Sequence, residues 1–131
     1  MTFRNIKILF MILLLCIVFT SCSDSTETVA LVQPQYQGNE LPLEIWSTVK
    51  LQKLSMKWNS CVVDESGESI EIGTKVLVLE KANCDEVIWN VTEPSAIFRT
   101  SLVKIRVIDT GQEGYTWSSA ANIQNESSLN P

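Results

Sequence analysis

Apolar and polar positions alternate with a period of two over much of the chain after residue 43, which is the pattern of short β-strands with one buried face. The segment 102–109 shows this most clearly, because two sets of side chains fall on opposite faces of an extended chain: Val103, Ile105 and Val107 against Lys104, Arg106 and Ile108. We therefore expect a half-buried strand there.

Other segments extend the same interpretation. Residues 75–80 form a mostly apolar strand after a turn at Gly73, and residues 87–91 form a second strong strand. Two glycines at 111 and 114 predict a tight turn before a strand that starts at 115. The piece 41–61 fits a helix or a strand, and we favour strands at 48–51 and 58–63. Residues 119–123 close the domain. The predicted fold class is all-β, in a small antiparallel domain.

A different pattern begins the chain. Arg4 and Lys7 precede an uninterrupted apolar run at 8–19, whose 12 residues suit the core of a signal peptide and are too few to span a bilayer. Small residues at 20 and 21 follow, and then Cys22. The stretch resembles the lipobox of bacterial lipoproteins, with Phe19 in place of the usual aliphatic residue.

That resemblance implies cleavage after residue 21 and acylation of Cys22 by fatty acyl chains such as palmitate, which would hold the protein on a lipid membrane. It places the protein in the bacterial cell envelope, and Ser23 in place of Asp favours the outer membrane, facing the periplasm. The alternatives are an ordinary cleaved secretory peptide or an uncleaved anchor. Cys16 is a rival acceptor, but the bulky Leu15 before it argues against cleavage there.

Polar composition sets the expected domain limits. Residues 22–42 are rich in Ser, Thr, Gln and acids, so we expect a flexible tether, and residues 126–131 are expected to be a disordered tail. One domain is then left at 43–125, after the signal peptide at 1–21.

Charge narrows the function classes. The chain has 10 basic and 15 acidic residues, and removal of Arg4 and Lys7 leaves 8 against 15, a net charge of −7. Nucleic-acid binding needs a basic stripe, so we exclude it. The two remaining cysteines, Cys61 and Cys84, are expected to form a disulfide in an oxidising compartment, with free thiols as the alternative. With no histidine and no CxxC spacing, we predict no metal site and no cofactor.

The second half of the domain resembles a bacterial Src-homology-3-like barrel. The residues that carry the resemblance are spread over three predicted strands and their turns: Gly73, Val76, Val78, Leu79, Trp89, Gly111, Gly114 and Tyr115. The resemblance implies a small barrel, and bacterial modules of this type are often described as binding peptidoglycan or peptides. Two departures from the pattern are the extra segment 92–101 and Ser118 and Ser119 at the place of the usual proline.

The sequence lacks the residue combinations that catalysis needs, so we predict that the protein is not an enzyme. Without histidine there is no Ser-His-Asp or Cys-His arrangement. Four acids surround an evident turn at 66–67, where a solvated loop is the simplest interpretation and a Ca²⁺ or acid-base site the alternative: Asp64, Glu65, Glu68 and Glu71.

Aromatic residues are the binding candidates. Tyr115 and Trp117 lie two apart on one strand, so they share a face and either form an exposed ledge or pack over the end of the barrel. Phe98 and Arg99, in the extra segment, are typical of an interface anchor, or else fold back onto the domain. The overall hypothesis is a lipid-anchored, non-catalytic protein that binds another envelope protein or peptidoglycan. The alternative is an inhibitor or immunity-type lipoprotein that blocks a cell-wall hydrolase or phage.

Overall fold

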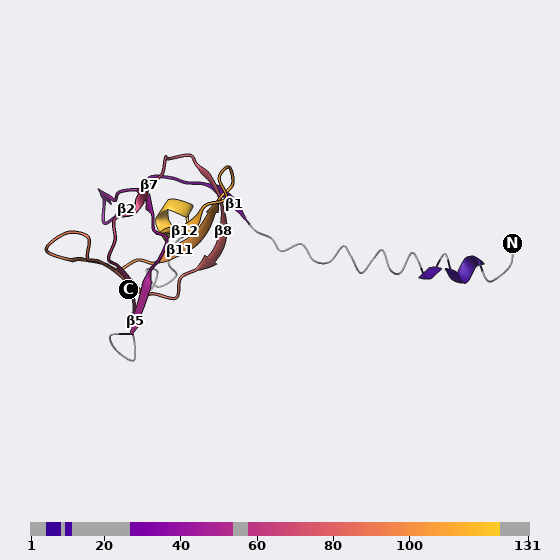
Figure 1. Cartoon of the computed structure of the whole chain (residues 1–131), viewed down its shortest axis with the longest axis horizontal. Helices are drawn as coiled ribbons and strands as arrows, with labels where there is room; N and C mark the ends of the chain where they lie inside the picture. The colour runs from indigo at the N-terminus through magenta and orange to yellow at the C-terminus, as the bar shows by residue number, and fades with distance from the viewer. Residues whose placement is uncertain (1–4, 9, 12–26, 54–57, 124–131) are drawn as a thin grey trace.

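The computed structural model describes residues 5–8, 10–11, 27–53 and 58–123 (Figure 1). The fold is all-β, as the alternating pattern predicts. Its elements are β1 (Thr28–Ala30), β2 (Gln35–Tyr36), β3 (Asn39–Glu40), β4 (Glu44–Ile45), β5 (Lys50–Lys53), β6 (Asn59–Val63), β7 (Glu68–Ser69), β8 (Lys75–Lys81), β9 (Glu86–Trp89), β10 (Ala96–Phe98), β11 (Leu102–Val107), β12 (Glu113–Trp117) and a final 3₁₀ helix, η1 (Ser118–Ala121).

The first sheet has the strand order β1-β8-β11-β12, and its pairs are all antiparallel. Its inner strand β11 confirms the predicted alternation, since Val103, Ile105 and Val107 are buried while Arg106 is exposed. The pairing of β11 with β8 shifts register after Lys104, which bends this end of the sheet.

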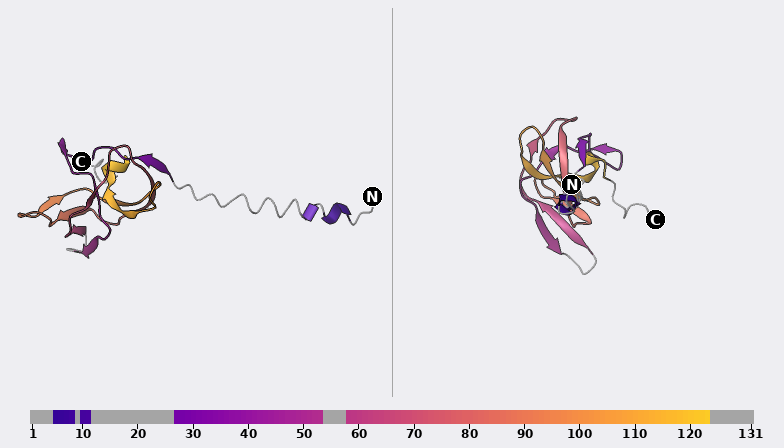
Figure 2. Two further views of the ribbon diagram at one scale, coloured as in Figure 1. Left: turned by 45° about the horizontal axis from the view of Figure 1, so that its top comes forward. Right: turned by 90° about the vertical axis from the view of Figure 1, so that its right-hand side faces the viewer.

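The second sheet has the order β10-β9-β6-β5. Its strands β6 and β9 pair in parallel, whereas its other pairs are antiparallel. Strands β5 and β6 extend away from the rest of the domain (Figure 2). The described strands pair as two four-stranded and two two-stranded sheets and are not assigned to one closed ring, so the Src-homology-3-like barrel stays a prediction.

The predicted disulfide is confirmed. Cys61 in β6 is bonded to Cys84 in the loop between β8 and β9, with 5.6 Å between the Cα atoms. Both residues are buried, and the bond fixes this loop to the second sheet.

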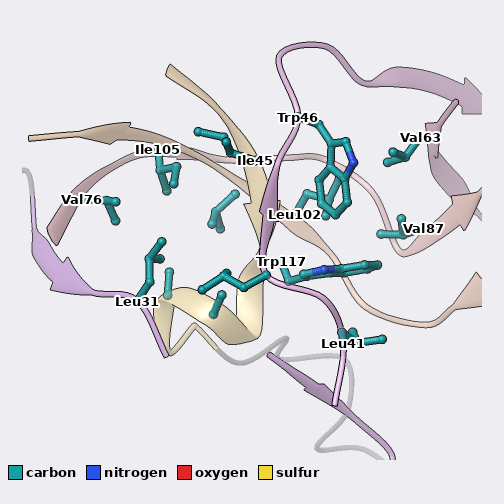
Figure 3. Close-up of a cluster of buried hydrophobic side chains, with 14 of the residues drawn as sticks. Leu31, Leu41, Ile45, Trp46, Val63, Val76, Val87, Leu102, Ile105 and Trp117 are labelled. Carbon is teal, nitrogen blue, oxygen red and sulfur yellow. The ribbon is translucent and has the colours of Figure 1, made fainter. Parts of the chain in front are cut away.

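The core fills the space between the sheets with aliphatic residues from both, and Trp46 and Trp117 lie among them (Figure 3). Trp117 packs edge to face on Trp46, with 5.3 Å between the ring centroids, and on Phe98 at 5.4 Å. Its indole N–H donates to the carbonyl oxygen of Pro42 at 3.0 Å. Such edge-to-face pairs add to the free energy gained from burying the rings.

The domain begins earlier than the sequence predicts, so the assignment of residues 28–42 to a tether is wrong. Strand β1 pairs with β8, and β2 pairs with β3. Leu31, Pro34 and Leu41 are buried. Three buried residues and a backbone ladder are enough to order a segment that looks polar in composition. Residues 22–26, including Cys22, and residues 126–131 lie outside the described residues.

Two further segments have structure that the sequence analysis left unspecified. The extra segment at 92–101 contains a short strand, β10, which pairs with β9 at the edge of the second sheet. Residues 118–121, where the domain closes, form the 3₁₀ helix η1. Residues 5–8 and 10–11 are helical and exposed, and no helix of the described residues is long and apolar enough to cross a membrane.

Candidate functional site: a cleft beside Tyr115

Trp117 is a core residue. Its side chain is 0% exposed, and Trp46, Phe98 and Trp89 surround it. Of the two alternatives left open for Trp117, an exposed ledge or packing over the end of the domain, the structure contradicts the ledge. Rings from three other segments cover Trp117, so it is not available as a binding residue.

Phe98 and Arg99 have different surroundings. Phe98 is half-buried and packs on Tyr36, with 5.3 Å between centroids, as well as on Trp117. Arg99 is exposed, and its guanidinium lies over the ring of Trp58 at 5.6 Å. Neither residue makes a ring contact or a hydrogen bond with Tyr115 in the described part of the chain. The two therefore do not form one site with Tyr115.

Tyr115 remains partly exposed, and its surroundings are well defined. It lies in a row across the first sheet, opposite Lys104 in β11, which is itself opposite Glu80 in β8. The Lys104 ammonium is 6.0 Å from the centre of the tyrosine ring. The backbone of Tyr115 exchanges two hydrogen bonds with that of Trp46, of 2.7 and 2.8 Å. This pair of hydrogen bonds fixes the segment that follows Trp46 beside the tyrosine.

Two hollows meet at Tyr115 and Val49, and together we call them the Tyr115 cleft. The first has a volume of about 370 Å³ and is lined also by Ser47, Thr48, Lys104, Glu113 and Gly114. The second, of about 250 Å³, is lined also by Leu51, Cys61, Glu80, Lys81, Ala82 and Asn83. The cleft thus runs along residues 47–51, between them and the first sheet. An aromatic ring with an apolar floor and polar edges is suited to hold a peptide or a sugar.

The disulfide positions one wall of the cleft. Cys61 lies in its floor, and Cys84 is next to Asn83, a wall residue. The loop that carries Ala82 and Asn83 is also held by hydrogen bonds between its backbone and both sheets, from Ala82 N–H to Leu102 and from Asp85 N–H to Asn59. A wall tied to both sheets is preorganised for binding.

The charged groups at the far end of the cleft are already paired. Arg106 donates two hydrogen bonds to Glu113, of 2.6 and 2.9 Å. These bonds, together with the positive charge of the guanidinium, lower the pKa of Glu113. Glu113 thus stays ionised at neutral pH, and its charge is compensated within the sheet.

Of the four acids near the turn at 66–67, only Glu65 and Glu68 line a common hollow. Asp64 accepts hydrogen bonds from Lys50 and Asn90, which lower its pKa, whereas Glu68 accepts one from Gln112. Among residues 27–53 and 58–123, no group of three or more His, Cys, Asp or Glu residues is placed to hold a metal ion. In the described residues these acids are a surface feature with local partners.

No protein-family model, curated protein or solved structure matches this chain. The cleft must therefore be interpreted from its own chemistry.

Sequence reasoning singled out Tyr115 but did not predict the other residues that line the cleft. Val49 and Leu51 look like core residues, because each sits between polar neighbours in a strand-like pattern. Their role depends on how far the first sheet covers the second, and no local pattern carries that information.

Proposed function

We propose that this protein is a lipid-anchored bacterial envelope lipoprotein whose domain, of the Src-homology-3-like type, binds another envelope component in the Tyr115 cleft without catalysing a reaction. The component is an envelope protein or peptidoglycan. The observation that carries the proposal is the cleft itself, in which a partly exposed tyrosine lies beside an apolar floor and a wall that a disulfide holds in place. The lipobox-like sequence ending at Cys22 supports the anchor.

Anchoring suits a binding protein of this size. An acylated Cys22 would confine the domain to one membrane, which raises its local concentration near any ligand in the same compartment. A cleft that buries one or two residues or sugars would then be enough for useful occupancy. The oxidising compartment implied by the anchor also agrees with the disulfide.

Retention on purified sacculi and on envelope proteins tests the proposal. Wild-type protein should be retained, and Tyr115→Ala should lose most of this retention because the ring lines both hollows. Trp58→Ala is the control: it removes an aromatic residue that is 45% exposed, lies just before β6 and does not line the cleft, so it should leave retention unchanged. Equal retention of both variants would contradict the cleft assignment.

The anchor needs its own test. Mass spectrometry of the mature N-terminus should find an acylated cysteine at position 22, and Cys22→Ala should release the protein from the membrane fraction. An unmodified N-terminus at any position would contradict lipidation while leaving the cleft proposal untouched.

A second candidate is an inhibitor or immunity-type lipoprotein. The observation that favours it is a separate acidic hollow on the other side of residues 47–48, lined by Glu65, Glu68 and Gln112. Together with the negative net charge, this surface would suit a basic hydrolase such as a lysozyme. Protection of sacculi from lysozyme, lost in the double variant Glu65→Gln and Glu68→Gln, would support this function over the first.

A further inference from the structure

Strand β5 has an unoccupied edge. It is the last strand of the second sheet, it pairs with β6 on one side, and all four of its residues are exposed. No described residue pairs with its other side. An edge strand presents a row of backbone N–H and C=O groups that another extended chain can pair with. In Figure 2, β5 and β6 extend from the domain, so this edge is accessible.

The Tyr115 cleft lies along β5. Leu51 is the informative residue, because the strand register places it in one row with Cys61 and Val87, both of which are 0% exposed. Side chains in one such row share a face of the sheet. Leu51 is nevertheless 66% exposed. The core-facing side of the second sheet is thus left uncovered at β5, and the uncovered area is the floor of the cleft.

The charges around this part of the cleft are mainly positive, although the protein is acidic. Lys81 and Lys104 line the cleft, and Lys53 shares the face of Leu51 two positions away. Glu80 is the opposing acid, and Glu113 is compensated by Arg106. Lys50 pairs with Asp64. Three lysines against one glutamate, in a chain with 15 acids and 10 bases, favour an acidic ligand.

We propose that the ligand of the Tyr115 cleft is an extended, acidic segment of a partner protein, which adds to the second sheet as a strand beside β5. This inference rests on the proposed function and specifies the ligand class. Backbone pairing with β5 would supply affinity, and apolar side chains of the segment would cover Leu51, Val49 and Tyr115. Its carboxylates would meet Lys53, Lys81 and Lys104. Addition of a strand to a free sheet edge is a common mode of peptide recognition.

The probes are two capped eight-residue peptides, consisting of two repeats of Glu-Val-Val-Glu and two repeats of Lys-Val-Val-Lys. In an extended conformation both faces of either peptide carry apolar and charged side chains. The glutamate peptide should bind, more weakly as salt rises, and the lysine peptide should bind at least about tenfold more weakly. Hydrogen exchange should show new protection at those amides of residues 50–53 that do not already bond to β6.

Matched variants locate the site. Leu51→Gln and Lys81→Glu should each weaken binding of the glutamate peptide by about fivefold or more, because one removes apolar contact and the other reverses a charge. Ile72→Gln and Lys75→Glu make the same chemical changes at exposed positions outside the cleft and should stay within about twofold of the wild type. All four positions are exposed, so the fold should be retained.

Four results are distinguishable. Binding of the glutamate peptide with protection of β5 and sensitivity to the cleft variants supports the inference. Binding without protection of β5, or with no effect of Leu51→Gln, overturns the placement beside β5. Retention on sacculi that depends on Tyr115, with no binding of either peptide, overturns the inference and leaves the proposed function standing. If sacculi, envelope proteins and peptides all fail to bind, the proposed function fails as well.

Discussion

Removal of the disulfide should destabilise the domain strongly. Cys61 and Cys84 are 23 positions apart, and the loop that they close contains β7 and β8. The chain-entropy relation gives about 3.4 kcal/mol for a loop of this length at 25 °C. Cys61→Ala with Cys84→Ala adds a cost of about 1 kcal/mol for the two buried sulfur atoms left unreplaced. Total stabilities of small domains are about 5–15 kcal/mol, so we expect a large fraction to be lost.

Urea unfolding followed by tryptophan fluorescence measures the effect, because Trp46 and Trp117 lie in the core. The oxidised wild type, the reduced wild type and the double alanine variant should be compared. The reduced wild type separates the two contributions, since it keeps both sulfur atoms and lacks only the cross-link. A difference below about 1 kcal/mol between the oxidised and reduced wild type would refute the entropic argument for this loop.

Three further predictions concern the core, the domain boundary and pH. Trp117→Ala should lower the free energy of unfolding by about 3–5 kcal/mol, and Trp117→Phe by clearly less, as measured by urea unfolding; equal small losses would contradict a core position. Leu31→Ala should lower the free energy of unfolding by about 2–5 kcal/mol in the same assay, whereas no change would contradict the packing of the segment that contains β1 on the core. Lys50 and Asn90 lower the pKa of Asp64 in the folded state below its ordinary 3.8. As the pH falls, Asp64 therefore takes up a proton first in the unfolded state, and the stabilisation that these two contacts give at higher pH is lost. Wild-type stability should therefore fall more steeply below about pH 4 than that of Asp64→Asn, in acid titrations followed by circular dichroism, and parallel curves would contradict this.

The strands of the first sheet could be predicted from the sequence because their patterns are local. Strand β11 alternates from Val103 to Val107, and β8 contains a continuous apolar run bounded by charges. The disulfide followed from the expected compartment and from the presence of two remaining cysteines. These features depend on the residues themselves and on few distant contacts.

The predictions were wrong or incomplete where contacts with residues far away in the sequence decide whether a segment is ordered or buried. Strand β1 has only three residues, and its order comes from backbone pairing with β8, which begins 45 positions after its partner Ala30. Trp117 and Leu51 both sit on alternating strands, yet one is enclosed and the other is open. The parallel pairing of β6 with β9 also leaves no sign in an alternating pattern, because either direction gives the same faces.

The position of β1 limits how far the domain can travel. Strand β1 starts six residues after Cys22, and six extended residues span at most about 20 Å. In the lipidated protein that we propose, the domain would search only a thin layer next to the bilayer, and a partner deeper in the wall would be out of reach. Insertion of a flexible spacer before Thr28 would widen that layer, so in the lipidated protein the spacing between Cys22 and β1 would limit which ligands the domain can reach.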